Sequence, residues 1–280
     1  MSLLDDEDIL LDSERDKEVI KNWITRYYKC SSNLQIEWSD YYNIWLVSVQ
    51  GYVWVNDKSI TSLTNGLFRW WSTKGFGCSH CENLTSLKGA PKKVGGDFYC
   101  DNCKNLKSLK GAPKEVGEVF NCAYCENLRS LKGAPKDVYS FNCSGCENLE
   151  SLEGAPEKIM RQFNCDYCCK LTNLHGTENM VVQDFSCKYC KNLESLEGAP
   201  KKVTGFFNCK HCHKLKNLIG CPEEVGTTVS CYNCVNLIST QGLPKKLRNI
   251  VVAGCGQLWK KRDELDKLSD HYKKFGVVWE

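Results

Sequence analysis

Cysteine is the residue type with the most chemical potential in this chain, which holds 20 cysteines among 280 residues. Sixteen of them form eight Cys-x-x-Cys pairs. Thiol pairs at this spacing can bind zinc as thiolates, exchange disulfides, or pack as small apolar side chains. The first 19 residues carry eight carboxylates against two basic groups, which is unlike a secretion signal. We therefore expect a cytoplasmic location, where thiols stay reduced.

The cysteine pairs mark an internal repeat. Aligned on them, the chain contains eight consecutive copies of F-x-C-x-x-C-x-N-L-x-S-L-x-G-A-P-x-x-V, at steps of 22 residues with one step of 21. The alternation in F-x-C predicts a short strand with one buried face, and G-A-P predicts a turn. We number the copies coils 1 to 8; they begin at Phe76, Phe98, Phe120, Phe141, Phe163, Phe185, Phe207 and Val229.

The length of the repeat predicts how the coils assemble. A unit of this size cannot bury its own apolar face, whereas coils stacked in parallel share a continuous core of Phe, Cys, Leu and Val side chains. The expected fold is therefore a β-rich solenoid with short parallel strands. At a strand spacing of about 4.8 Å, roughly ten coils would form a rod about 45 to 50 Å long.

The repeat also carries a family resemblance. The pattern V-x-x-x-F-x-C-x-x-C-x-x-L-x-x-L resembles the leucine-rich repeat core over residues 51–258. The phrases LTSLKGAPKKVGGDFYC and LKGAPKEVGEVFNC resemble leucine-rich repeat proteins encoded by tailed bacteriophages and some bacteria. The resemblance implies a right-handed coil and a non-enzymatic scaffold that binds a protein through its exposed strand face. It further implies a phage or prophage factor that engages a host protein.

The segments outside the repeats predict caps. We divide the chain into an acidic tail and helical N-terminal cap (1–50), the leucine-rich repeat-like solenoid (51–258) and a C-terminal cap helix (259–280). A degenerate first coil without cysteines is indicated by Val53, Val55, Ile60 and Leu63. Tryptophans are expected to seal the open end of the core, or alternatively to form a platform for a carbohydrate or nucleobase; they are Trp45, Trp54, Trp70 and Trp71.

Two interpretations of the paired cysteines stay open. In the first, the thiols are free and point inward as two ladders, without a cofactor. In the second, pairs from adjacent coils supply four thiolates to zinc. Redox chemistry is disfavoured because no helix follows the pairs. One ladder is Cys78, Cys100, Cys122, Cys143, Cys165, Cys187, Cys209 and Cys231, and the other is Cys81, Cys103, Cys125, Cys146, Cys168, Cys190, Cys212 and Cys234; these are also the zinc ligands of the second interpretation.

A candidate binding face follows from the same alternation. If Phe and the first Cys of each coil point inward, the residues after each of them point outward on the strand face. Exposed tyrosines and histidines in a row are typical of a protein-contact surface. The candidate partner-binding residues are Tyr99, Asp101, Tyr124, Asp166, Tyr167, Lys188, Tyr189, Lys210, His211 and Tyr232.

Composition and motifs disfavour other functions. The formal net charge is only +3, which does not favour nucleic-acid binding. No apolar run is long enough to span a membrane, and no phosphate-binding glycine motif or nucleophile paired with a base indicates an enzyme. A charge gradient along the opposite edge is either a solvated edge or a docking site for an acidic partner or nucleic acid. Its lysines Lys88, Lys92, Lys93, Lys110, Lys114, Lys132 and Lys136 give way to Glu153, Glu157, Glu194 and Glu197.

Overall fold

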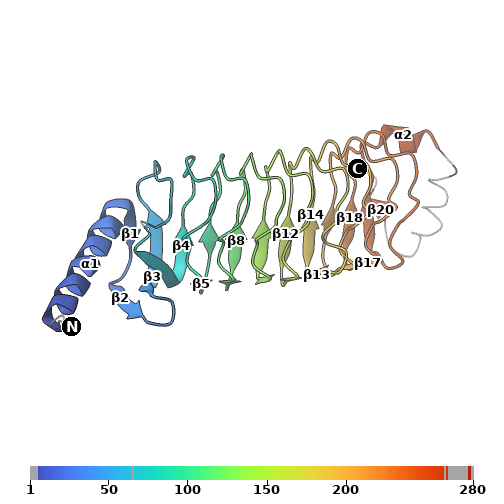
Figure 1. The fold of residues 1–280 in the computed structure, drawn as a ribbon. Helices are drawn as coiled ribbons and strands as arrows, with labels where there is room; N and C mark the ends of the chain where they lie inside the picture. The colour runs from blue at the N-terminus through green and yellow to red at the C-terminus, as the bar shows by residue number, and fades with distance from the viewer. Residues whose placement is uncertain (1–5, 65, 262, 264–276, 279–280) are drawn as a thin grey trace.

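The chain forms a β-solenoid of about nine turns, with a helix at the N-terminal end and a short helix near the C-terminal end (Figure 1). The computed structural model describes residues 6–64, 66–261, 263 and 277–278. Successive coils lie side by side along a rod. The expected fold class, a β-rich solenoid with short parallel strands, is thereby confirmed.

Each coil contributes one short strand to a parallel sheet that runs the length of the rod. Equivalent phenylalanines lie opposite one another in register, as in the pairs Phe98↔Phe120 and Phe163↔Phe185. These strands are β4 (Phe68–Gly77), β6 (Phe98–Tyr99), β8 (Val119–Asn121), β10 (Ser140–Asn142), β12 (Gln162–Asn164), β14 (Asp184–Ser186), β16 (Phe207–Asn208), β18 (Thr228–Ser230) and β19 (Asn249–Val251).

A second row of strands follows the Gly-Ala-Pro turns. Each has two residues, of which the second is a buried Val or Ile that points into the core. The row consists of β5 (Lys93–Val94), β7 (Glu115–Val116), β9 (Asp137–Val138), β11 (Lys158–Ile159), β13 (Val181–Val182), β15 (Lys202–Val203) and β17 (Glu224–Val225). The strands are short because the chain must turn at both ends of each to close a 22-residue coil.

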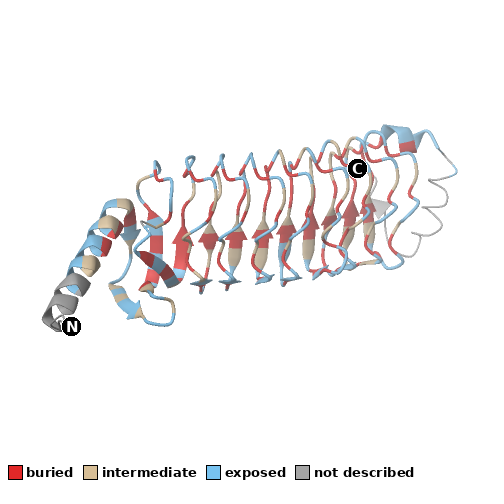
Figure 2. Cartoon of the chain, viewed as in Figure 1, coloured by how far each residue is buried: buried red, intermediate tan, exposed pale blue. Residues whose placement is uncertain are grey.

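Buried residues recur at equivalent positions in successive coils along the rod (Figure 2), so the core is continuous. Neighbouring phenylalanine rings from Phe76 to Phe207 are stacked with centroids 5.2 to 5.8 Å apart. The paired cysteines and the leucines of every coil are fully buried beside them. Each ring therefore packs on the coil before and the coil after it, so stability depends on neighbouring coils rather than on a single coil.

The N-terminal cap is a helix followed by a small mixed sheet. Its elements are α1 (Asp6–Tyr27), β1 (Tyr28–Cys30), β2 (Leu34–Ser39) and β3 (Ile44–Val55). Strand β3 pairs in parallel with β4, and Val53 lies opposite Phe76, which confirms the degenerate first coil. Strand β3 runs continuously through residues 50 and 51, where we placed the boundary between cap and solenoid.

Two of the four tryptophans seal the core and two do not. Trp45 and Trp70 are buried, and Trp70 packs edge-on against Phe76 at the end of the phenylalanine stack. Trp54 and Trp71 are 40% and 38% exposed, so the expectation that all four close the core was wrong. Trp54 is exposed because alternation along β3 places it on the face opposite Val53 and Val55.

The C-terminal end closes with a short helix and an added strand. Helix α2 (Gly256–Trp259) begins before the expected cap helix, most of which, at residues 262 and 264–276, lies outside the described residues. Strand β20 (Val277–Val278) pairs in parallel with β19, a continuation of the sheet that the sequence did not indicate. Cys255, although off the strict spacing, is fully buried in line with the second cysteine ladder.

Candidate functional site

The Cys-x-x-Cys segment forms a tight turn at the end of each Phe strand. The strands end no later than the residue before the first cysteine. The residue before the second cysteine is always in the left-handed region, with φ between 56° and 61° for non-glycine residues. These turn residues are His80, Asn102, Tyr124, Gly145, Tyr167, Tyr189, His211, Asn233 and Gly254.

Backbone hydrogen bonds continue from coil to coil through this turn. The N–H of Tyr167 donates to the carbonyl of Lys188 at 2.8 Å, and the N–H of Tyr189 donates to that of Lys210 at 2.8 Å. The N–H of the first cysteine donates in the same way, as from Cys165 to Ser186 at 2.8 Å. The positive φ is therefore enforced by the stacking of equivalent turns and is the same whatever side chain the position carries.

From coil 2 onward, the second cysteine of each pair fixes the turn from inside. Its thiol donates to the carbonyl oxygen of the first cysteine in the preceding coil, as from Cys125 Sγ to Cys100 at 3.2 Å. The same bond, with Sγ···O distances of 3.1 to 3.3 Å, recurs from Cys103, Cys146, Cys168, Cys190, Cys212, Cys234 and Cys255. Each carbonyl faces the core, where only a donor that is itself largely apolar can satisfy it.

This packing keeps the thiols of Cys100 and Cys122 protonated. Burial away from water, together with contact with the second cysteine of the next coil, raises the pKa of Cys100 and Cys122 well above the usual range. Zinc would require thiolates, which would break the thiol-to-carbonyl bonds and place charge beside stacked phenylalanines. In the part of the chain that the structure describes, no group of three or more His, Cys, Asp or Glu side chains is placed to hold a metal ion. The donor set thus fits packing and does not fit zinc.

Most of the predicted binding residues lie in the turn rather than on the strand face. Only Tyr99 belongs to a strand, β6. The other nine candidates follow the first cysteine of their coil and lie in the Cys-x-x-Cys turn. We had extended the strand alternation through the first cysteine, and this was wrong because the left-handed residue reverses the chain there. Apart from Asp166, which is buried, these side chains are partly or fully exposed at a corner of the rod.

Aromatic rings stack along this corner. The rings of Tyr167 and Tyr189 lie 4.6 Å apart and nearly parallel, and Tyr189 and His211 are 4.3 Å apart. His211 also contacts the edge of Tyr232 at 5.5 Å. Tyr124 lies over Gly145, where any β-carbon would collide with its ring. We call these five aromatic residues, Tyr124, Tyr167, Tyr189, His211 and Tyr232, the turn ridge.

The charged candidate residues differ in burial and in hydrogen bonding. Asp166 is only 5% exposed, and its carboxylate accepts hydrogen bonds from Ser186 Oγ at 2.6 Å and from the N–H of Lys188 at 2.8 Å. Lys188 Nζ completes the contact at 3.1 Å. Because its carboxylate is held inside the fold, Asp166 ties coil 5 to coil 6 and is not a contact residue. Lys210 is half-buried beside the ridge, and Asp101 accepts from Ser79 Oγ at 2.6 Å.

Sequence reasoning missed a second aromatic group on the strand face. The rings of Tyr52 and Trp54 lie parallel with centroids 6.2 Å apart, and Tyr99 is 6.1 Å from Trp54. Gly75 and Gly77 of the intervening strand lie directly beneath Tyr52 and Trp54, leaving room for the rings. The sequence contains the residues of this group, as Tyr52-x-Trp54 in β3 and Gly75-x-Gly77 in β4. That the two glycines lie opposite the two rings follows only from the register of the strands in the structure.

Comparisons with known proteins give no match. No family model matches the chain, and neither the curated proteins nor the solved structures contain a significant match. Searching the described residues also finds no helix with the length and apolar character needed to span a bilayer. The chain is thus established as a β-solenoid built on a repeat of about 22 residues with buried cysteine ladders.

Proposed function

We propose that the protein is a non-enzymatic scaffold that binds a protein partner through the turn ridge. The observation that supports this most is the presence of Tyr in left-handed turns. Left-handed backbone costs an ordinary residue about 1 kcal/mol or more, and only Gly, Asn and Asp adopt it readily. Coils 2, 4 and 8 use Asn102, Gly145 and Asn233 at this position. Tyr in coils 3, 5 and 6 is therefore a costly choice for the turn alone.

The exposed rings do not recover this cost by burial. Tyr124 and Tyr167 are 50% and 44% exposed. Ring stacking within the ridge returns some stability, about 0.5 to 1.5 kcal/mol per pair. It also immobilises the side chains, so little entropy is lost when a partner contacts them. A row of rigid amphipathic rings with the adjacent Lys210 suits a protein surface that offers apolar and acidic groups.

The leucine-rich repeat resemblance and the free thiols extend the proposal. A repeat of this kind presents one variable position per coil on a constant frame, which is how solenoids build extended binding surfaces. Many free cysteines favour a reducing compartment such as the cytoplasm. The phage-like phrases Leu84–Cys100 and Leu109–Cys122 support a phage or prophage factor whose partner is a host protein.

The experiment compares capture from host lysate by the native chain and by a ridge variant carrying Tyr167→Asn, Tyr189→Asn and His211→Asn. Asn already occupies the same turn in coils 2 and 8, so the variant should fold normally. The control variant, Lys201→Asn, changes an exposed side chain on the opposite edge. We expect a protein, identified by mass spectrometry, that the native chain and the control capture and the ridge variant does not. Equal capture by all three would refute the proposal.

A further inference from the structure

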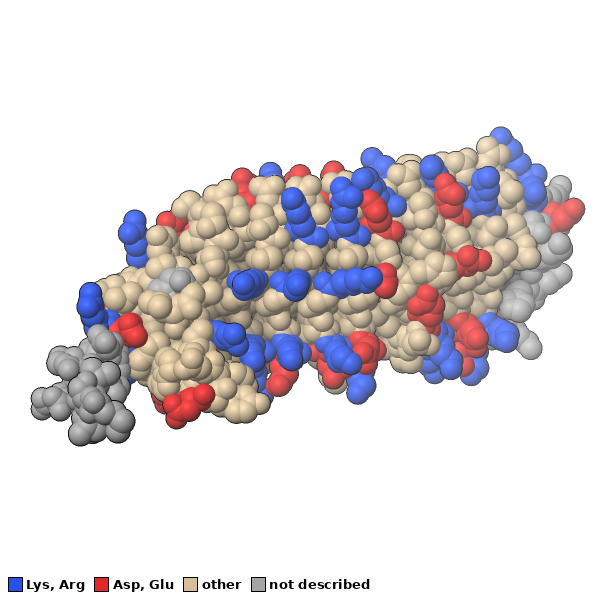
Figure 3. Space-filling view, viewed as in Figure 1, with Lys and Arg blue, Asp and Glu red and all other residues tan. Residues whose placement is uncertain are grey.

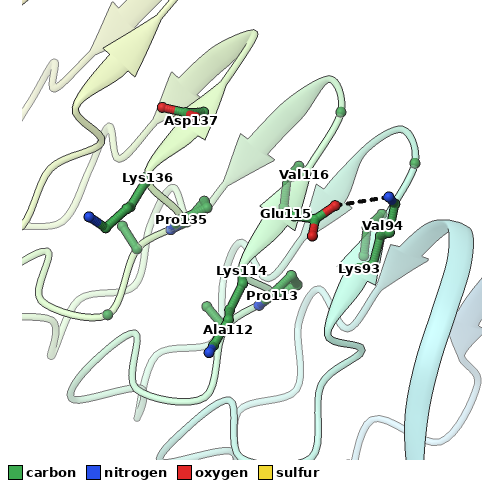
Figure 4. A pocket seen from close by; sticks show the side chains of 14 residues that line it. Lys93, Val94, Ala112, Pro113, Lys114, Glu115, Val116, Pro135, Lys136 and Asp137 are labelled. Carbon is green, nitrogen blue, oxygen red and sulfur yellow. Dashed lines mark ion pairs between the residues drawn. The ribbon is translucent and has the colours of Figure 1, made fainter.

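A groove on the Gly-Ala-Pro edge of coils 1 to 3 lies away from the turn ridge. It has a volume of about 720 Å³ and is lined by 14 residues, shown in Figure 4. Its floor and one wall are apolar, formed by Ala112, Pro113, Val116, Ala134 and Pro135. None of the lining residues is aromatic. The equivalent groove between coils 6 and 8 is about half as large, at about 370 Å³.

A row of lysines follows one side of the groove, and two of its members, Lys114 and Lys136, line the groove. Lys92, Lys114 and Lys136 occupy the same position in coils 1, 2 and 3, and the N–H of Lys114 donates to the carbonyl of Lys92 at 3.0 Å. Only one end of the row is paired with an acid, where Lys136 Nζ lies 3.0 Å from Glu157. At the other end, Lys92 Nζ lies 4.6 Å from the ring centroid of Tyr42, a cation–π contact that holds the side chain and leaves its positive charge. Lys114 stands between them, exposed, with no acidic partner among the described residues.

A second lysine row repeats this arrangement on the other side of the Gly-Ala-Pro turns. It consists of Lys88, Lys110 and Lys132, and it ends where Lys132 Nζ lies 3.0 Å from Glu153. Lys110, like Lys114, is flanked by lysines and has no acidic partner in the described part of the chain. Rows of basic side chains along the rod are visible in Figure 3. Coil 2 is thus the centre of two like-charge rows, an arrangement that a bound anion would stabilise.

The far bank of the groove carries no excess of positive charge. Lys93 Nζ is paired with Glu115 at 2.9 Å (Figure 4). Asp137 follows in coil 3. Positive charge is therefore concentrated on the Gly-Ala-Pro side, while the space beside it is apolar. A ligand that matches both features must carry negative charge along one side and apolar groups along the other.

From these observations we infer that this groove binds an extended acidic peptide segment with alternating apolar side chains. In an extended peptide, successive side chains point to opposite sides, so acidic groups can face Lys110 and Lys114 while apolar groups enter the groove. Single-stranded nucleic acid fits less well, because proteins bind its bases by stacking on aromatic rings and the groove offers none. A solvated edge alone would account for the lysines but not for the apolar groove beside them.

The test measures fluorescence anisotropy of labelled octapeptides with the full chain. Alternating Glu-Leu should bind, alternating Lys-Leu should not, and Glu-Ser of equal charge should bind at least about tenfold more weakly because it leaves the groove unfilled. Affinity should fall as salt is raised from about 50 to 300 mM. Equal affinity for Glu-Leu and Glu-Ser would show that the peptides bind by charge attraction alone, without filling the apolar groove. Tighter binding of oligothymidine than of Glu-Leu would show that the groove binds nucleic acid. Either result would overturn the proposal.

Two matched variants locate the binding. Lys110→Glu with Lys114→Glu should weaken Glu-Leu binding at least about tenfold, while Lys201→Glu, at the position of Lys114 but in coil 6, should change it less than about twofold. The thermal midpoint of each variant checks its fold; if the double variant unfolds, Lys110→Gln with Lys114→Gln replaces it. Unchanged affinity in the folded double variant would contradict the assignment. Ridge variants should bind the octapeptide normally, so the two binding sites are tested separately.

Discussion

The two corners of each coil reverse the direction of the backbone in different ways. At the Cys-x-x-Cys corner the chain turns through a residue that need not be glycine, and buried thiols hold the turn from inside. At the Gly-Ala-Pro corner every coil uses glycine, with φ between 85° and 112°. The difference arises outside the core: the first corner has space for side chains, whereas at the second the backbone of the preceding coil lies against the turn. The side chain can therefore vary at the first corner.

The largest effect is expected from placing alanine at the two corners. A β-carbon on Gly133, which has φ +100°, would lie 2.7 Å from the backbone of Leu109. Gly133→Ala should therefore lower the free energy of unfolding by about 2 to 4 kcal/mol. Gly145→Ala, in the Cys-x-x-Cys corner of the next coil, meets only the movable ring of Tyr124 and should cost about 1 kcal/mol. Urea denaturation measures both, and equal losses would show that the corners do not differ.

The next effect concerns the thiol ladder. Cys125→Ala should cost about 2 to 3 kcal/mol, because it leaves the buried carbonyl of Cys100 without a donor and opens a small cavity. Cys125→Ser keeps a donor and should cost less than the alanine variant, although the hydroxyl is shorter and more polar. Urea denaturation of the Cys125→Ala and Cys125→Ser variants measures how much the hydrogen bond to the carbonyl of Cys100 contributes to stability. If Ala and Ser are equally destabilising, the sulfur contributes volume only.

Coil 5 provides a smaller test, because its glycine corner lacks the Ala-Pro sequence. Thr177 takes part there instead, and its buried hydroxyl donates to the carbonyl of Gly198 at 2.7 Å. Thr177→Ala should cost about 1 to 2 kcal/mol, and Thr177→Ser should retain most of the stability. Thermal unfolding of the two variants shows whether a side-chain hydrogen bond replaces proline at this corner. Identical midpoints for Ala and Ser would argue against it.

The smallest effect on stability is expected at the turn ridge. Tyr167→Asn relieves left-handed strain but loses stacking on Tyr189, so the free energy of unfolding should change by less than about 0.5 kcal/mol. Partner capture should nevertheless fall. Calorimetry measures the change in stability, and the capture assay measures the change in partner binding. A loss of more than about 2 kcal/mol would show that the ring is a packing element and would remove the main support for the proposed function.

The sequence predicted the frame more completely than the surface. Repeated Phe, Cys and Leu positions identified the solenoid and its core. In a stack of similar coils, these apolar side chains can be buried only in the interior that the coils share. Nine of the ten candidate binding residues lie in the Cys-x-x-Cys turns and not on the strand face where the sequence placed them. Asp166 looked like a contact residue, and its burial depends on Ser186 and Lys188 of the next coil, a neighbour 20 or more residues away.

Sequence alone thus determined the period and the inward cysteines, because the same residue types recur at the same positions in every coil. It also determined the charge change along the rod, because equivalent positions can be compared from coil to coil. Tertiary structure decided which outward residues act together. The left-handed turn, the stacking of Tyr167 on Tyr189, and the groove beside Lys114 all depend on how one coil sits on the next. The physical reason is that contacts between coils set side-chain direction and spacing at the surface, where no apolar periodicity constrains them.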